Sequence, residues 1–240
     1  MVTETTDQQA AAQTLAPSQW IRFVVLSLIL PSILLLCGGD VRWWQGWAYA
    51  VVMFVITVGG RVWADRRNPG LMVERARAED AEGVKPWDKA LSPLMALSSS
   101  VVLYIVAGLD HRFGWSPPFP VWLAILGLVL VLLGYAFSTW AMVENRFFSA
   151  VVRVQRDRGH TVCSSGPYRI VRHPGYAGNF LALPGIALAL TSLWTIIPVA
   201  LALAIAVMRT SLEDRTLQDE LAGYREYAQR TRFRLIPGVY

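Results

Sequence analysis

The stretch NFLALPGIALALTSLWTIIPVALALAIAVM, residues 179–208, decides the topology of this chain. As one helix rising about 1.5 Å per residue it would measure roughly 45 Å. A hydrocarbon core of about 30 Å needs roughly 17–25 residues, so this stretch is too long for one untilted crossing. Pro184 and Pro198 interrupt it, and Thr191-Ser192 offers a place to turn. It is therefore either one tilted, kinked helix or a tight hairpin of two short helices.

Four further apolar stretches precede this one. Each is long enough to cross a bilayer, and tryptophans near several of their ends suit the interfacial aromatic belt. The chain is 54% hydrophobic and only 16% charged, whereas soluble domains carry about a quarter charged residues. The sequence therefore predicts an all-α polytopic integral membrane protein, whose first four spans are Trp20–Cys37, with Pro31 as a kink, Trp43–Trp63, Leu91–Leu109 and Phe119–Val143.

The distribution of basic residues separates the two interpretations of residues 179–208. Arginine and lysine gather in residues 61–89, in residues 146–172 and in the tail from Arg209, whereas residues 38–42 and 110–118 are short and nearly neutral. The positive-inside rule places all three basic regions in the cytoplasm. Residues 179–208 must then cross an even number of times. This favours the hairpin and predicts five to six membrane segments, with six if the hairpin forms.

The two ends of the chain differ in character. Residues 1–18 are polar and alanine-rich, lack the positive n-region of a signal peptide, and are expected to form a disordered arm. Residues 19–240 are expected to form a single membrane domain. After Met208, apolar side chains recur at near-helical spacing between charges, which predicts a C-terminal amphipathic helix from Leu212, Leu217, Leu221, Tyr224 and Tyr227.

Several kinds of chemistry find no support in the sequence. The net charge is +5, but the basic residues flank apolar blocks, so we expect membrane lipids rather than nucleic acid as the partner. Neither the two cysteines nor the three histidines have metal-type spacing, so no metal site is predicted. No glycine-rich nucleotide loop follows a strand pattern, which disfavours Rossmann and P-loop sites.

Residues 144–176, ENRFFSAVVRVQRDRGHTVCSSGPYRIVRHPGY, form the most informative segment. Its four central arginines are typical of a loop that contacts lipid phosphates. That interpretation explains poorly why two imidazoles and two tyrosines stand among turn residues. We therefore interpret these four as functional, with either histidine open as a base: His160, Tyr168, His173 and Tyr176. The lipid-facing interpretation applies to Arg146, Arg153, Arg156 and Arg158.

A second group of polar residues follows the last apolar stretch. Arg209 and Glu213 are four residues apart and share one helix face, so a plain surface salt bridge explains them by spacing alone. Both stand at the membrane boundary, where an unpaired charge is costly. An arginine there suits an anionic substrate head group, and a glutamate suits a cation or hydroxyls. The spacing leaves these alternatives open.

These two segments together resemble a known family. Residues 166–176, GPYRIVRHPGY, resemble the GPYxxxRHPxY signature of the isoprenylcysteine carboxyl methyltransferase family. Arg209, Glu213, Asp214 and Leu217 resemble its RxxxEExxL element, with Asp214 in place of the second glutamate. The first half of the chain is similar mainly in its hydrophobic profile, and eukaryotic members are longer. The resemblance implies a membrane-embedded methyltransferase that uses S-adenosylmethionine.

The resemblance also implies roles for individual residues, mainly within residues 144–240. Arg209 would contact the substrate as the catalytic residue. The cofactor would contact Gln155, His160, Thr161, Val162, Cys163, Tyr168, His173, Pro174, Gly175, Tyr176 and Glu213. The acceptor would be a lipophilic small molecule or a prenylated substrate, with a carboxylate as one candidate. The site would face the cytoplasm, in the inner membrane of a bacterium.

Three alternatives stay open from the sequence. The first is methylation of a phospholipid amine or of a thiol, because related membrane methyltransferases share the RHPxY-like loop. The second is an NADPH-dependent sterol-type reductase, which shares that loop and a C-terminal segment like residues 234–240. The third is a lipid-binding membrane protein without catalysis. The GPY before RHP and the RxxxE pair favour methyl transfer.

Overall fold

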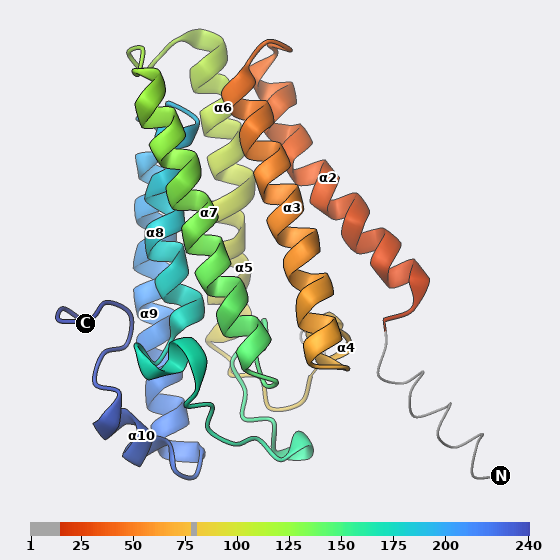
Figure 1. The fold of residues 1–240 in the computed structure, drawn as a ribbon, viewed down its shortest axis with the longest axis vertical. Coiled ribbons are helices and arrows are strands. Elements are labelled where there is room, and N and C mark those ends of the chain that lie inside the picture. Colours follow the sequence, from red (N-terminus) through yellow and green to blue (C-terminus); the bar gives the residue numbers. More distant parts are fainter. Residues whose placement is uncertain (1–14, 78–80) are drawn as a thin grey trace.

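The computed structural model describes residues 15–77 and 81–240. Most of the expected N-terminal arm, residues 1–14, lies outside the described residues. Within them no strand occurs, and the helices pack into the bundle that Figure 1 shows. In chain order these helices are α2 (Pro17–Gly38), α3 (Trp44–Arg67), α4 (Leu71–Ala76), α5 (Asp88–Leu97), α6 (Leu103–Phe113), α7 (Val121–Glu144), α8 (Pro174–Ala189), α9 (Ile196–Glu220) and α10 (Tyr224–Arg230).

The predicted spans are confirmed. Five helical segments are long and apolar enough to cross a membrane: α2, α3, the continuous segment Asp88–Phe113, α7 and α9. α8, with 16 residues, is the shorter sixth segment. The segment Asp88–Phe113 includes a π-helical turn, Ser98–Val102, that joins α5 to α6. Serine hydroxyls there donate to carbonyls one turn earlier, which loosens the regular helical pattern.

Residues 179–208 form the expected hairpin. The chain turns between α8 and α9, where Thr191 adopts a left-handed backbone (φ 54°) and the Ser192 hydroxyl donates to Asp110. The turn lies at the same end as the α2–α3 and α6–α7 connections (Figure 1). We call this the short-loop end. The other end, which we call the basic end, carries α4, residues 145–173 and α10.

The C-terminal boundary differs from the expectation. The amphipathic pattern after Met208 begins inside α9, which runs on to Glu220 without a helix breaker. Gly223, at φ 80°, then redirects the chain into the short helix α10. Leu221, Tyr224 and Tyr227 turn inward and are buried. The predicted amphipathic helix is therefore divided between the end of α9 and α10, and the tail covers the basic end.

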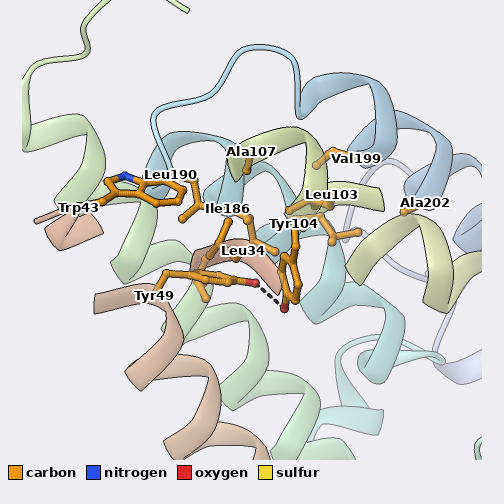
Figure 2. Close-up of a cluster of buried hydrophobic side chains, with 12 residues drawn as sticks. Leu34, Trp43, Tyr49, Leu103, Tyr104, Ala107, Ile186, Leu190, Val199 and Ala202 are labelled. Atoms are coloured by element: carbon orange, nitrogen blue, oxygen red, sulfur yellow. Dashed lines mark hydrogen bonds between the residues drawn. The ribbon is translucent and has the colours of Figure 1, made fainter. Parts of the chain in front are cut away.

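Apolar packing dominates the middle and the short-loop end. Figure 2 shows the main cluster, in which α2, α3, α6, α8 and α9 bury side chains such as Leu34, Leu103 and Ile186. The hydroxyls of Tyr49 and Tyr104 pair at 3.1 Å inside it.

The α7–α8 seam depends on small residues. A Cβ built on Gly134 would lie 2.5 Å from the Gly178 carbonyl oxygen, and one on Gly178 would lie 2.3 Å from the Gly134 oxygen. Such contacts let the backbones of neighbouring membrane helices approach closely. This close seam brings the end of α7 and the start of α8 together at the basic end.

Candidate functional site

A cavity of about 450 Å³ opens at the basic end of the bundle. This volume lies in the range typical of small-molecule sites. Side chains from α3, α4, α5, α7, α8, α9 and α10 and from residues 145–173 line it. Of the residues that the family resemblance assigns, the structure gathers around this cavity all except Gln155, namely His160, Thr161, Val162, Cys163, Tyr168, His173, Pro174, Gly175, Tyr176, Arg209 and Glu213.

Gln155 supports the wall without lining it. Its side chain is buried, its Nε2 donates to the Phe147 carbonyl at 2.8 Å, and its Oε1 accepts from Arg158 at 2.5 Å. Its backbone N–H lies 3.2 Å from Nδ1 of His160, whose ring packs against Phe147 with centroids 4.5 Å apart. Gln155 therefore fixes the position of two residues that do line the cavity.

His160 is neutral at physiological pH. Burial, together with the positive charges of Arg153 and Arg158, lowers the pKa of its imidazole to about 4. As a neutral ring it accepts the backbone N–H of Gln155 at Nδ1. His160 can therefore accept a proton or a hydrogen bond, but it supplies no positive charge to a ligand.

Tyr168 stands in the 3₁₀ turn Gly166–Arg169 that the GPYR sequence forms. Gly166 has φ 53°, and a Cβ there would lie 2.8 Å from the Glu144 side chain, so this turn requires glycine. The Tyr168 hydroxyl donates to the Ala141 carbonyl at 3.4 Å and accepts from Asn145 at 3.3 Å. Burial raises the pKa of this phenol well above its usual value, so the ring presents a neutral aromatic surface.

The arginine and histidine of the RHP sequence turn toward α9. Arg172 holds Asp214 bidentately, with Nε–Oδ1 2.7 Å and Nη2–Oδ2 2.9 Å, and His173 Nε2 lies 3.2 Å from the same Oδ1. Arg234 and Tyr224 also donate to Asp214, at 3.0 and 3.1 Å. Asp214 is fully buried. This carboxylate therefore joins the RHP loop, α9 and the C-terminal tail into one unit.

Arg209 pairs with a residue that the sequence did not indicate. Its Nε lies 2.5 Å from Oδ1 of Asp88 and its Nη2 lies 2.9 Å from Oδ2, while Nη2 also donates to the Ala150 carbonyl at 3.0 Å. The guanidinium lies 5.6 Å from the Tyr176 ring centroid. The surface salt bridge with Glu213 that spacing alone suggested is not formed.

Glu213 is left with unused hydrogen-bonding capacity. Its Oε2 is buried and has no hydrogen-bond partner within residues 15–77 and 81–240. Leaving a buried carboxylate oxygen unsatisfied costs free energy, and such atoms are typical of sites that bind a ligand. Glu213 therefore points to a donor supplied by a bound molecule.

Asp88 and Glu74 are the charged residues that sequence reasoning missed. Asp88 is fully buried at the start of α5 and accepts from the Val152 N–H at 2.7 Å as well as from Arg209. A lone acid at the start of an apolar span was the only local signal for it. Glu74 pairs with Arg153 at 2.5 Å, and Asp157 adds a second contact at 2.9 Å. The lipid-facing interpretation of Arg153 was therefore wrong, because that guanidinium is buried and neutralised within the protein.

The fold and the cavity define a polytopic all-helical membrane protein whose buried arginine–carboxylate pairs, Arg153–Glu74, Arg172–Asp214 and Arg209–Asp88, surround one ligand-sized site. Comparison with known proteins adds the family resemblance. Residues 122–222 match the family described as phospholipid methyltransferase. This segment contains both motifs and ends within the tail that covers the cavity.

Individual relatives are similar to parts of the chain. The cobalt-zinc-cadmium resistance protein CzcN of Cupriavidus metallidurans is 35% identical over 134 residues, which is 55% of this chain and 58% of the relative. Protein-S-isoprenylcysteine O-methyltransferase B of Arabidopsis thaliana is 28% identical over 45% of this chain and 57% of its own length. The Saccharomyces cerevisiae protein-S-isoprenylcysteine O-methyltransferase is 32% identical over 40% of this chain and 38% of its own length.

The matched region thus spans less than two thirds of each of these relatives. Within it, the expected resemblance to the isoprenylcysteine carboxyl methyltransferase family is confirmed.

Proposed function

We propose that this protein is an S-adenosylmethionine-dependent methyltransferase that acts on a lipophilic, membrane-associated acceptor. The observation that carries the proposal is the unpartnered, buried Oε2 of Glu213 in a cavity lined by the residues that the family resemblance assigns to the cofactor. The match to methyltransferase relatives over the same segment supports it.

The residues around the cavity suit this cofactor. Glu213 can accept hydrogen bonds from an ammonium or from hydroxyls. Tyr168 and Phe148 offer aromatic faces, which favour a cationic or planar ligand. A Cβ on Gly175 would lie 2.8 Å from the Phe148 ring, so glycine keeps this ring in place beside the start of α8. When bound, the cofactor would supply an activated methyl group on its sulfonium centre.

The remaining walls suit a lipophilic acceptor. Ile56, Met95 and Met142 line the cavity from α3, α5 and α7, three of the membrane-spanning segments. These side chains therefore suit an acceptor with an apolar body. Water is largely excluded from such a surface, which strengthens electrostatic positioning.

Arg209 is the proposed catalytic residue, and Asp88 is its positioning residue. A carboxylate acceptor is ionised at neutral pH and needs no general base, so Arg209 would only have to orient it. The bidentate pair with Asp88 fixes the guanidinium plane before a ligand arrives. A phospholipid amine or a thiol would need to lose a proton, and neutral His160 is then the available acceptor.

We place the site on the cytoplasmic side of a bacterial inner membrane, within a single domain over residues 19–240. The three arginine-rich segments at the basic end support this orientation by the positive-inside rule. S-adenosylmethionine is available on that side.

Isothermal titration of the detergent-purified protein tests the proposal. S-adenosylmethionine and S-adenosylhomocysteine are expected to bind, and Glu213→Gln is expected to weaken binding about 10- to 100-fold, because a hydrogen bond to a charged group contributes roughly 1.5–3 kcal/mol. Asp219→Asn, an exposed change on the same helix, is the matched control and should leave affinity unchanged. Binding of NADPH alone would overturn the proposal in favour of the reductase.

A further inference from the structure

Two arginines at the edge of the cavity play no part in the proposed reaction. Arg61 lies near the end of α3 and Arg75 lies in α4, and both are partly buried. Both line the main cavity, and both also line a second, smaller cavity of about 170 Å³. The second cavity is formed with the beginning of α2, through Gln19, Trp20 and Phe23. The two guanidiniums therefore stand where the two cavities adjoin.

These arginines differ from the other cavity arginines in having no carboxylate partner within the described part of the chain. Arg153, Arg172 and Arg209 each hold an acid at 2.5–2.7 Å. Arg61 instead lies 3.8 Å above the Phe23 ring, and Arg75 lies 5.3 Å from the Phe148 ring centroid. An aromatic face attracts a cation but does not neutralise its charge.

The surroundings of Arg61 and Arg75 make their two positive charges energetically unfavourable unless an anion binds beside them. Burial, together with the nearby positive charge of Arg209, lowers the pKa of the Arg75 guanidinium to about 10. Among the described residues, Glu74 and Asp88 are already engaged, with Arg153 and Arg209, and Asp65, four residues after Arg61 on α3, forms no ion pair with it. Two like charges that share a low-dielectric space are relieved by a ligand that carries negative charge.

The position of the pair indicates what kind of ligand carries that charge. Toward the basic end α2 leans away from α3 (Figure 1), and the second cavity lies at this place. The outer surface of α2 is apolar, with Ile21 and Val25 exposed. Trp20 marks the level of the membrane interface, where tryptophan is enriched. A ligand here would have its anion at the arginines and an apolar chain along α2.

We propose that Arg61 and Arg75 bind the anionic headgroup of a membrane phospholipid at the junction of the two cavities, with its acyl chains along α2. Guanidinium groups suit phosphate because their planar donors match its oxygens two at a time. The site does not depend on methyl transfer. A lipid bound at this site would form a lateral wall of the main cavity.

Native mass spectrometry of the protein released from nanodiscs of equimolar phosphatidylglycerol and phosphatidylcholine tests the site. The unmodified protein is expected to retain phosphatidylglycerol preferentially, and R61Q/R75Q is expected to lose this preference at least fivefold. R66Q/R67Q is the matched control, because these arginines are exposed at the same end of α3 and line neither cavity. Equal retention in R61Q/R75Q, or no preference in the unmodified protein, overturns the proposal.

Three further measurements distinguish a bound lipid from free phosphate and from an acid of this chain. The single variants R61Q and R75Q serve if the double variant does not fold, and unchanged retention in both also overturns the site. Thermal stabilisation by inorganic phosphate equal to that by phosphatidylglycerol would assign the pair to free phosphate instead. A rise in lipid retention in E79Q/D80N would show that these acids compete with the lipid for the arginines, and would support the lipid site.

Titration with S-adenosylmethionine in the same preparations keeps this proposal distinct from the proposed function. The unmodified protein and R66Q/R67Q, whose substituted arginines line neither cavity, are expected to bind the cofactor with equal affinity. Absence of cofactor binding in every preparation would overturn the methyltransferase proposal and leave the lipid site standing.

Discussion

The two ends of the helix bundle are built differently. At the short-loop end, connections are brief. There the buried carboxylate Asp110 accepts from uncharged donors, namely the Ser116 N–H at 2.7 Å, the Ser116 hydroxyl at 2.6 Å and the Ser192 hydroxyl. At the basic end, three buried or nearly buried ion pairs surround the cavity. Buried ion pairs add little net stability over apolar packing. Their concentration at one end therefore indicates a site whose geometry they fix.

Removing the charge of Asp214, the carboxylate that joins the RHP loop, α9 and the C-terminal tail, is expected to lower the free energy of unfolding more than any other change. Asp214→Asn leaves Arg172 and Arg234 without their counter-charge, and breaking a buried pair in this way costs about 3–5 kcal/mol. Unfolding in mixed micelles with increasing SDS measures the loss. Asp40→Asn at the short-loop end is the control, since Asp40 is an exposed partner of His111, and it should unfold as the unmodified protein does. Equal losses at both ends would contradict the comparison.

The ion pair between Asp88 and Arg209 is expected to show strong coupling in the free energy of unfolding. Asp88→Asn and Arg209→Gln should each destabilise the protein, because each leaves one buried charge uncompensated. The double variant should recover part of the loss, with a coupling of roughly 0.5–3 kcal/mol. The same unfolding assay, applied to all four proteins, gives the coupling. Strict additivity would show that the pair does not act as a unit.

Lowering the pH should reduce the folding stability of the protein through protonation of His160. The pKa of this imidazole is about 4 in the folded protein, below the value of about 6.5 for an unfolded chain. As pH falls from 6.5 toward 4, the unfolded state takes up the proton first, so stability falls across this window and is unaffected above it. The loss should be on the order of 1 kcal/mol between pH 6.5 and 5.

Stability measured at pH 7.5 and pH 5 for the unmodified protein and His160→Asn checks this effect. Asparagine keeps an acceptor for the Gln155 N–H but does not titrate. The variant should therefore lose less stability at pH 5. The same loss in both proteins would assign the acid sensitivity to other groups.

The smallest effect is expected inside the apolar cluster away from the site. Tyr49→Phe removes the hydroxyl pair with Tyr104, and such bonds between membrane helices average about 0.6 kcal/mol. The SDS unfolding midpoint should shift slightly, and cofactor affinity should stay the same. Adding Tyr104→Phe should change little more, since no partner is then left unsatisfied. A loss as large as that of Asp214→Asn would remove the distinction between the two ends.

The fold was predictable because its signals are local. Apolar run length located the spans, and the basic segments favoured a hairpin over residues 179–208, which the turn at Thr191-Ser192 confirms. The extent of the last helix was not predictable in the same way. The pattern after Met208 predicted an amphipathic helix that follows the last apolar stretch, but α9 continues through these residues, and Asp214 finds its partners inside the protein.

The sequence predicted which residues form the candidate site, but not which of them pair with one another. Glycine, proline and aromatic spacing marked residues 144–176, and much of this segment lines the cavity together with Glu213. The spacing also suggested that Arg209 and Glu213 pair, whereas Arg209 holds Asp88, 121 residues earlier. Helical spacing reports only which side chains share a face. It does not report which acid another helix brings to that face.

By itself, therefore, the sequence determined the long apolar helices, the hairpin over residues 179–208, the end that carries the basic residues and the segment that contributes most to the cavity wall. Each follows from hydrophobic run length, charge asymmetry or turn chemistry, which act over neighbouring residues. Only the tertiary structure decided that Asp88 and Asp214 neutralise Arg209 and Arg172, and that Arg61 and Arg75 stand without an acid among the described residues. These pairings depend on helix packing, which juxtaposes residues far apart in the chain and leaves no periodic trace in the sequence.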